Sequence, residues 1–358
     1  MKLVKCCTGI TALILLLNPL FMYSATELKV LEWEGYISPF IEGFEKYAKS
    51  KNLDVKVSIV KPFITNPEQI YNAMRTGKAD VVTPTHNYYK MSKNKLMFVL
   101  QPIDTSKLSH YKDLASSLQT ASYDQYKGQK YSVPLLGGSY GLAYNEDKVK
   151  QAPASWEVLW DSQYKDQYSI TNDQFEANLY TVLITMGYPA QSVYDIDKIK
   201  GFKKDKKKIQ EKLNQLVFNA KFFWGGVLPA DKMPELTFGT TYWFGVAEAN
   251  SKGQHWKLAS PKEGQTVWLD TMALSKQLAK DPKKLAAAYL LLDYMISPEV
   301  QEKVHAMYGS VIVNGKTKNS VIGDQSFFKE EYFWKPLTSR TRNTYKIMWE
   351  KAMRVRGN

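Results

Sequence analysis

The chain has 358 residues, a formal net charge of +13 and two cysteines, Cys6 and Cys7. Both cysteines lie before an apolar run near the N-terminus, which excludes disulfides and cysteine metal sites from the rest of the chain. One hydrophobic core seldom grows to this length, so we expect two lobes.

The first 25 residues have the pattern of a secretory signal peptide. Lys2 and Lys5 provide a charged start, residues 10–21 form the apolar run, and small residues lead up to Ala25. The run is too short to span a membrane. We therefore expect cleavage after Ala25 and export of a soluble mature chain.

The first part of the mature chain alternates strands and helices, the order of an α/β lobe with a mostly parallel sheet. Ligands of such sheets bind beyond the carboxyl ends of the strands, and Trp33 and Thr85 follow two of these ends. The predicted elements are the strands 28–31, 54–59 and 79–82 and the helices that begin at Pro39 and, after the Asn66 cap, at Pro67.

Residues 131–136 and 141–145 are predicted to be two extended pieces joined by 137–139. We interpret them as a crossing between lobes in which the glycines absorb a hinge rotation. Residues 137–141 also fit the G-x-S-x-G pattern of a serine hydrolase, with Ser139 as nucleophile. That mechanism needs a helix after the serine, whereas the following residues look extended, so the hydrolase is a lower alternative.

The stretch 171–176 follows a predicted strand and opens a helix that Thr171 or Asn172 would cap. Asp173 and Glu176 are three residues apart, which would place both carboxylates on one face of the first turn. They could simply complement the helix dipole, or they could receive an organic cation. A glycosidase pair is a lower alternative, because carboxyl groups on one helix face would not flank a glycosidic bond.

Aromatic residues stand beside carboxylates or glycines at other predicted strand ends as well. Carboxylates and aromatic faces together are typical of a receptor for an organic cation. The residues concerned are Trp33, Glu34, Tyr36, Trp243, Trp268 and Asp270, with Trp243 in a predicted strand at 242–245 and Trp268 in one at 267–274.

Residues 198–212 carry many lysines and an apolar stripe at helical spacing, formed by Ile199, Phe202, Ile209, Leu213 and Leu216. A solvated helix face is the expected interpretation, and contact with anionic lipid headgroups or a membrane partner is the alternative. Further helices are predicted at 282–295, 298–309 and 344–353. The histidines are scattered without ligand spacing, so no metal site is expected.

The order of these motifs resembles the periplasmic spermidine/putrescine (polyamine)-binding proteins of ABC transporters, which are family 1 extracellular solute-binding proteins. The resemblance includes Trp-x-x-Tyr at 33–36, Asn-Asp-x-x-Glu at 172–176, Trp-x-Asp at 268–270 and the tryptophan-flanked stretch 155–160, and it covers essentially the whole mature chain.

The resemblance implies an α/β, two-lobed periplasmic binding protein fold, the Venus-flytrap fold, with hinge crossovers. Its implied segments are the signal peptide 1–25, lobe 1 at 26–135 and 263–312, and lobe 2 at 136–262 and 313–358. A monomer would then bind a polyamine in the periplasm and pass it to ABC permease subunits in the inner membrane. Catalysis, a cofactor, a metal and nucleic acid would play no part.

The resemblance also implies roles for individual residues. Trp33 and Tyr36 match aromatic residues of the family's Trp-x-x-Tyr segment, and Thr85 matches a hydroxyl residue of its pocket. Trp243 and Trp268 match indoles that line the methylene chain. Asp173, Glu176 and Asp270 match carboxylates that receive amines.

Four positions depart from the family pattern. Gly35 stands where an acid is usual, although Glu34 could replace it, and Asn87 and Ser310 stand at or near positions of expected tyrosines. Lys335 aligns with a glutamine that contacts the ligand. A lysine there would favour a carboxylate, so a zwitterionic amino acid derivative or an opine is the alternative ligand.

Overall fold

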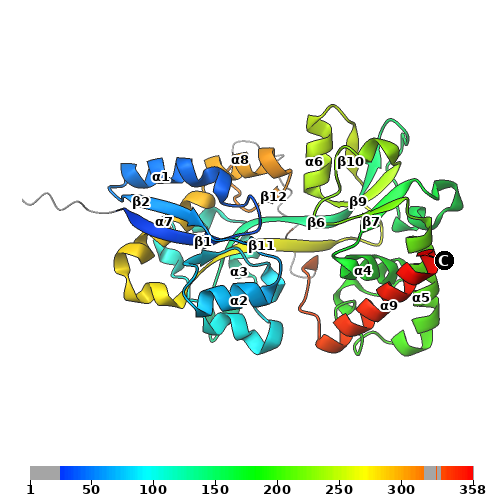
Figure 1. Cartoon of the computed structure of the whole chain (residues 1–358), viewed down its shortest axis with the longest axis horizontal. Coiled ribbons are helices and arrows are strands. Elements are labelled where there is room, and N and C mark those ends of the chain that lie inside the picture. Colours follow the sequence, from blue (N-terminus) through cyan, green and yellow to red (C-terminus); the bar gives the residue numbers. More distant parts are fainter. Residues whose placement is uncertain (1–24, 318–327, 329–331, 358) are drawn as a thin grey trace, which may run out of the picture.

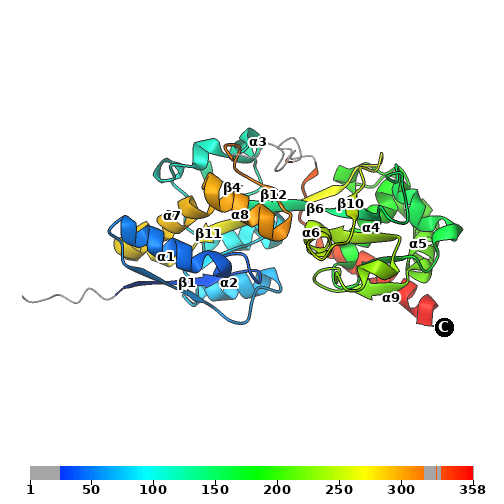
Figure 2. The same cartoon turned by 90° about the horizontal axis from the view of Figure 1, so that it is seen from above.

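The computed structural model describes residues 25–317, 328 and 332–357, with the side chains of 92–94 and 243 excepted. Apart from Ala25, the predicted signal peptide therefore lies outside the described residues. Figures 1 and 2 show two lobes side by side along the long axis, joined by two long strands, β6 (Val133–Asn145) and β11 (Thr266–Leu274).

The first lobe is built mainly from the N-terminal residues and from two helices that follow β11. Its elements are β1 (Thr26–Leu31), α1 (Ile41–Ser50), β2 (Val55–Ile59), α2 (Pro67–Arg75), β3 (Val81–Val82), α3 (Ser116–Thr120), β4 (Gln125–Tyr126), β5 (Gln129–Lys130), α7 (Pro282–Met295), α8 (Pro298–Tyr308) and β12 (Val311–Ile312).

The second lobe contains most of the middle of the chain and the C-terminal helix. Its elements are β7 (Tyr168–Thr171), α4 (Phe175–Thr185), α5 (Phe202–Asn219), β8 (Phe222–Trp224), β9 (Phe238–Tyr242), α6 (Trp243–Ser251), β10 (Trp256–Leu258) and α9 (Ser339–Gly357).

One sheet runs through both lobes in the order β2-β1-β3-β11-β6-β9-β7-β8, and β10 and β12 pair with β6. Strands β1, β2 and β3 are parallel, as the alternation of strands and helices predicted, whereas β11 is antiparallel to both β3 and β6. Helices α1 and α7 pack on this sheet in the first lobe. The expected lobe boundaries remain a prediction, because β6 and β11 run through both lobes without a break.

Most helix predictions agree with the structure where a cap or a clear apolar stripe marked them. The Asn66 side chain accepts a hydrogen bond from the amide of Gln69, and that of Asp281 from the amide of Lys284. All five residues of the predicted apolar stripe around α5 are buried, and α5 packs against α9. The alternative, contact of α5 with lipid headgroups or a membrane partner, stays a prediction.

The predicted break at 137–139 is wrong, because these residues lie in the middle of β6. The glycines are needed there for close packing. A Cβ atom at Gly138 would lie 2.7 Å from the indole of Trp268, and one at Gly137 would lie 2.5 Å from the ring of Phe328. Sequence reasoning took these glycines for a turn, whereas long-range packing against a neighbouring strand explains them.

Two further element predictions are wrong. Helix α4 begins at Phe175 with Gln174 at its N-cap, so neither Thr171 nor Asn172 caps it. The strand expected at 242–245 ends at Tyr242, where α6 begins. Within the described residues, no helix has both the length and the apolarity that a membrane span requires.

Candidate functional site

Asp270 lies at an irregular point of β11, where the pairing register with β6 shifts. It also forms an isolated bridge to Thr85, which follows the carboxyl end of β3. Trp268 and Asp270 are two residues apart on the strand, so their side chains project from the same face. The indole of Trp268 and the carboxylate of Asp270 therefore lie on one face of β11, where the two lobes meet.

The Asp270 carboxylate is buried, with 4% of the residue exposed, and only part of it is hydrogen-bonded. Its Oδ2 accepts a bond of 2.7 Å from the hydroxyl of Tyr36, which follows the carboxyl end of β1. The Thr85 hydroxyl lies near enough to this carboxylate to lower its pKa. Its Oδ1 is buried and has no hydrogen-bond partner among the described residues.

Burial raises the pKa of the Asp270 carboxyl to about 6, although the hydroxyl groups of Thr85 and Tyr36 lower it. The main cause is desolvation, which penalises the charged form. At neutral pH the group is therefore mostly ionised, yet its Oδ1 is buried and has no donor among the described residues. A cation placed at Oδ1 would remove this penalty.

Aromatic rings connect the two lobes beside Asp270. The ring of Tyr36 lies 6.3 Å from that of Tyr308 on α8, and Tyr308 makes an edge contact of 5.7 Å with Phe244 on α6. Phe244 stacks on Trp268 at 5.8 Å, and Trp268 meets Tyr242 edge-on at 6.2 Å. These rings could cover an alkyl chain or face a cation.

Three indole groups in this region retain an unused donor. The Nε1 atoms of Trp33, Trp268 and Trp334 are buried and lack a hydrogen-bond partner in the part of the chain that the structure describes. Trp334 lies between Tyr180 and Tyr242, at ring distances of 6.3 and 6.5 Å. Its carbonyl oxygen contacts Nε2 of the buried His86 at 2.8 Å, which fixes this segment against the first lobe.

Sequence reasoning missed Trp334 and pointed to its neighbour Lys335, which aligns with a ligand-contacting glutamine. Lys335 is exposed in the structure, and its place among the ligand contacts stays a prediction. Asn87 is half-buried and Ser310 is fully buried, and the side-chain oxygen of each lacks a described partner.

Asp173 and Glu176 do not share a helix face, contrary to the prediction. Asp173 is exposed and lies before α4. Its Oδ1 accepts a hydrogen bond of 2.9 Å from the Thr171 hydroxyl, and its Oδ2 accepts one of 2.8 Å from the amide of Gly226. Glu176 lies in the first turn of α4, and its Oε1 accepts a hydrogen bond of 3.0 Å from Nε of Arg342 on α9. Both carboxylates therefore already have partners within the second lobe.

Tyr88, which sequence reasoning also missed, is coupled electrostatically both to Asp270 and to the Glu176–Arg342 pair. Burial and then the negative charge of Asp270 raise the pKa of its hydroxyl, and Glu176 raises it further, whereas Thr85 and Arg342 lower it. Tyr88 thus lies within electrostatic range of a carboxylate from each lobe. It belongs to a short 3-10 turn, His86–Tyr88, directly after Thr85.

Two predicted site residues remain, Glu34 and Trp243. Glu34 is exposed, whereas Glu32 is the buried acid of that segment and accepts hydrogen bonds from the amides of Ile37 and Ser38. Trp243 is the first residue of α6, and its side chain lies outside the described residues.

The structure contradicts the geometry that either enzyme alternative needs. Ser139 is fully buried inside the continuous strand β6, and no helix follows it. Glu176 is paired with Arg342 and Asp173 with the Gly226 amide, so they do not face each other across a substrate. Among the described residues, no group of three or more His, Cys, Asp or Glu side chains is arranged to hold a metal ion.

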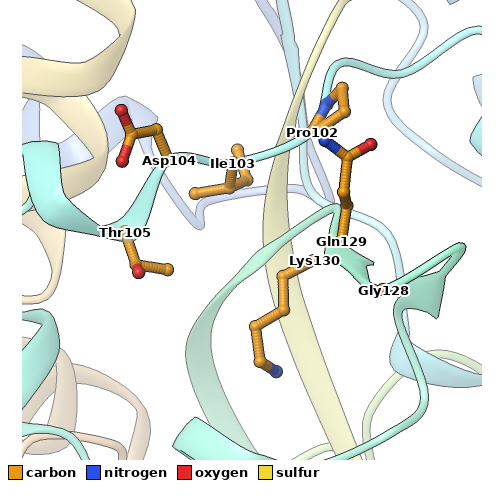
Figure 3. Close-up of a pocket in the computed structure, with 7 residues that line it drawn as sticks. All are labelled: Pro102, Ile103, Asp104, Thr105, Gly128, Gln129 and Lys130. Atoms are coloured by element: carbon orange, nitrogen blue, oxygen red, sulfur yellow. The ribbon is translucent and has the colours of Figure 1, made fainter.

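A separate surface pocket of about 430 Å³ lies in the first lobe, shown in Figure 3. Lys130, which lines this pocket, forms an ion pair of 3.3 Å with the buried Asp124. None of the predicted site residues contributes to it. The lining residues are Pro102, Ile103, Asp104, Thr105, Gly128, Gln129 and Lys130.

Residues 76–329 match the sequence family described as bacterial extracellular solute-binding protein. The chain belongs to this family. It is 25% identical over 338 residues to the spermidine/putrescine-binding periplasmic protein of Salmonella typhimurium, which covers 85% of this chain and 89% of that protein. It is also 25% identical over 294 residues to the putrescine/agmatine-binding protein of Pseudomonas aeruginosa, which covers 77% of this chain and 75% of that protein.

The spermidine/putrescine ABC transporter substrate-binding protein PotD of Streptococcus pneumoniae has a similar solved structure, with a TM-score of 0.74 and 20% identity. The match covers 93% of this chain and all of that one. The expected two-lobed α/β binding-protein fold is thereby confirmed. In this solute-binding protein, Asp270 and the rings around it lie between the lobes, which is where ligands of two-lobed proteins are held.

Proposed function

We propose that this solute-binding protein captures an organic amine of the polyamine class, such as spermidine or putrescine, between its lobes and delivers it to an ABC importer. The observation that carries the proposal is the buried Asp270 carboxylate, whose Oδ1 lacks a described partner. An ammonium group is the complement that this oxygen needs, since it supplies both a positive charge and a donor.

The surroundings of Asp270 support an amine that carries an alkyl chain. Tyr36, Phe244, Trp268 and Tyr308 offer ring faces and edges that can bury methylene groups and attract a cation. The similar proteins of Salmonella typhimurium and Pseudomonas aeruginosa are named for binding spermidine, putrescine or agmatine. The residue chemistry and the relatives thus point to the same ligand class.

The cellular setting belongs to the same proposal. The pattern of residues 1–25 supports export and removal of a signal peptide, and the relatives from Salmonella typhimurium and Escherichia coli are named as periplasmic. The protein would act as a monomer in the periplasm and hand its ligand to permease subunits in the inner membrane.

A thermal melt series tests the ligand class. A ligand that binds only the folded protein raises the melting temperature with the logarithm of its concentration at saturation. We expect spermidine or putrescine to raise it, and aspartate and glucose to leave it unchanged. Mass spectrometry of small molecules that co-purify with the protein should then identify an amine. A shift with glucose or aspartate and none with either amine would refute the proposal.

A further inference from the structure

The Glu176 carboxylate, which was expected to receive an amine of the ligand, is paired with an arginine of the same lobe. Its Oε1 lies 3.0 Å from Nε of Arg342, and the Glu176 side chain is 16% exposed whereas that of Arg342 is 64% exposed. Arg342 lies in the first turn of α9, which packs against α4, the helix that carries Glu176. The ion pair thus joins two packed helices of the second lobe.

Arg342 also faces the first lobe. Its pKa is raised first by the hydrogen bond to Glu176, and the Glu68 carboxylate and the Tyr88 hydroxyl of the first lobe raise it as well. Tyr88 in turn lies within electrostatic range of Asp270. Glu176 also lies one turn before Tyr180 on α4, and the Tyr180 ring lies 6.3 Å from that of Trp334. The ion pair therefore lies at the second-lobe end of the rings of the candidate site.

The ion pair changes what a second ammonium would meet. A free Glu176 would attract it, but a Glu176 already paired with a guanidinium presents almost no net charge. A cation that approaches Glu176 is repelled by Arg342 over a similar distance, so attraction and repulsion largely cancel. Asp270 differs, because its described contacts come from neutral hydroxyls and leave its charge uncompensated.

We propose that Arg342 determines the charge of the ligand that this site selects. The ligand is recognised through one ammonium at Asp270 and through its alkyl chain, and a second ammonium contributes nothing at the Glu176 end. The substrate class is then an alkyl amine whose far end is equally acceptable with or without a charge. The inference rests on the proposed function, that the site binds an organic amine.

Two four-carbon ligands isolate the contribution of the second ammonium. Putrescine carries an ammonium at both ends, and 4-aminobutan-1-ol replaces one of them by a hydroxyl. Calorimetry gives the affinity ratio of the two ligands for the wild type, for Arg342→Gln and for the double variant Arg342→Gln/Glu176→Gln. The matched control is Arg340→Gln, which removes the same charge from the same helix where it pairs with the exposed Asp197.

We expect the wild type to bind the two ligands within about threefold of each other. Arg342→Gln frees Glu176 and should raise the preference for putrescine at least tenfold, about 1.4 kcal/mol. The double variant removes both charges, so its affinity ratio should return to that of the wild type. Arg340→Gln should have the same affinity ratio as the wild type. Because Arg342 is largely exposed, its replacement should not prevent folding.

Three results would overturn the inference. They are a ratio for Arg342→Gln within threefold of the wild type, an equal change with Arg340→Gln, and a tenfold loss of putrescine preference in the double variant relative to the wild type. The last would mean that Glu176 binds the ammonium despite its partner. Any of these with tight amine binding leaves the proposed function intact, whereas failure of the wild type to bind either amine refutes both.

Discussion

Replacement of Asp270 by asparagine should weaken ligand binding and at the same time relieve the unliganded protein of a buried charge. The pKa of this carboxyl rises from 3.8 to about 6, mainly through burial. Folding therefore favours the protonated form. Ionisation of Asp270 therefore lowers the free energy of unfolding, by about 3 kcal/mol at neutral pH. This loss is present in full above pH 6 and disappears below pH 3.8.

Asparagine is close in shape to aspartate and can still accept the hydrogen bond from Tyr36. Its amide nitrogen would take the place of Oδ1, which lacks a described partner, at a cost of about 1–3 kcal/mol. The net effect on the free energy of unfolding without ligand should thus be a gain of about 0–2 kcal/mol at pH 7.5. Ligand binding loses a charge-assisted hydrogen bond of about 1.5–3 kcal/mol, or about 10- to 100-fold in affinity.

Urea unfolding of the ligand-free protein measures the first effect, and calorimetry with putrescine measures the second. Asp124 provides the matched control, because it is also a fully buried carboxylate of the first lobe but is paired with Lys130 and bonded to the hydroxyl and amide of Ser132. Asp124→Asn should lower the free energy of unfolding without changing affinity. Our reasoning would be refuted if Asp270→Asn behaved in this same way.

Three other outcomes are expected. The affinity for putrescine should fall up to tenfold per pH unit below about pH 6, because protonation neutralises Asp270, and calorimetry of Asp270→Asn should show no such dependence. Gly138→Ala places a Cβ 2.7 Å from the Trp268 indole and should lower the free energy of unfolding by about 1–3 kcal/mol in urea, whereas Gly357→Ala, in open space, should not. Trp334→Ala should weaken putrescine binding at least threefold in calorimetry, since it removes a ring beside Tyr180 and Tyr242.

The alternation of strands and helices in the first lobe was predictable because each element has a local signal. Apolar strands, the Asn66 cap and the prolines at helix starts all act within a few residues. The same local logic placed Trp33 and Thr85 at strand ends. It also singled out Asp270, because an indole and a carboxylate two residues apart on a strand share one face.

Features that depend on contacts between distant segments could not be predicted in this way. Gly138 looked like part of a turn because the indole of Trp268, which requires a glycine there, lies 130 residues further along the chain. Glu176 looked available because its partner, Arg342, is separated from it by 166 residues. A single sequence contains no local signal for either contact.

The two ends of the candidate site have different origins in the chain. Asp270 is held by the sheet, at a register shift in β11 and next to the ends of β1 and β3, so the strands that define the fold also define this carboxylate. Trp334 and Arg342 come from the C-terminal segment, beyond residue 329, where the match to the solute-binding family ends. Trp334 is tied to the sheet, because its amide donates a hydrogen bond to the carbonyl of Val267 on β11, whereas Arg342 lies on α9, outside the sheet. Under the proposed function, a substitution at Arg342 would alter ligand selection while Asp270 keeps its place on the strand.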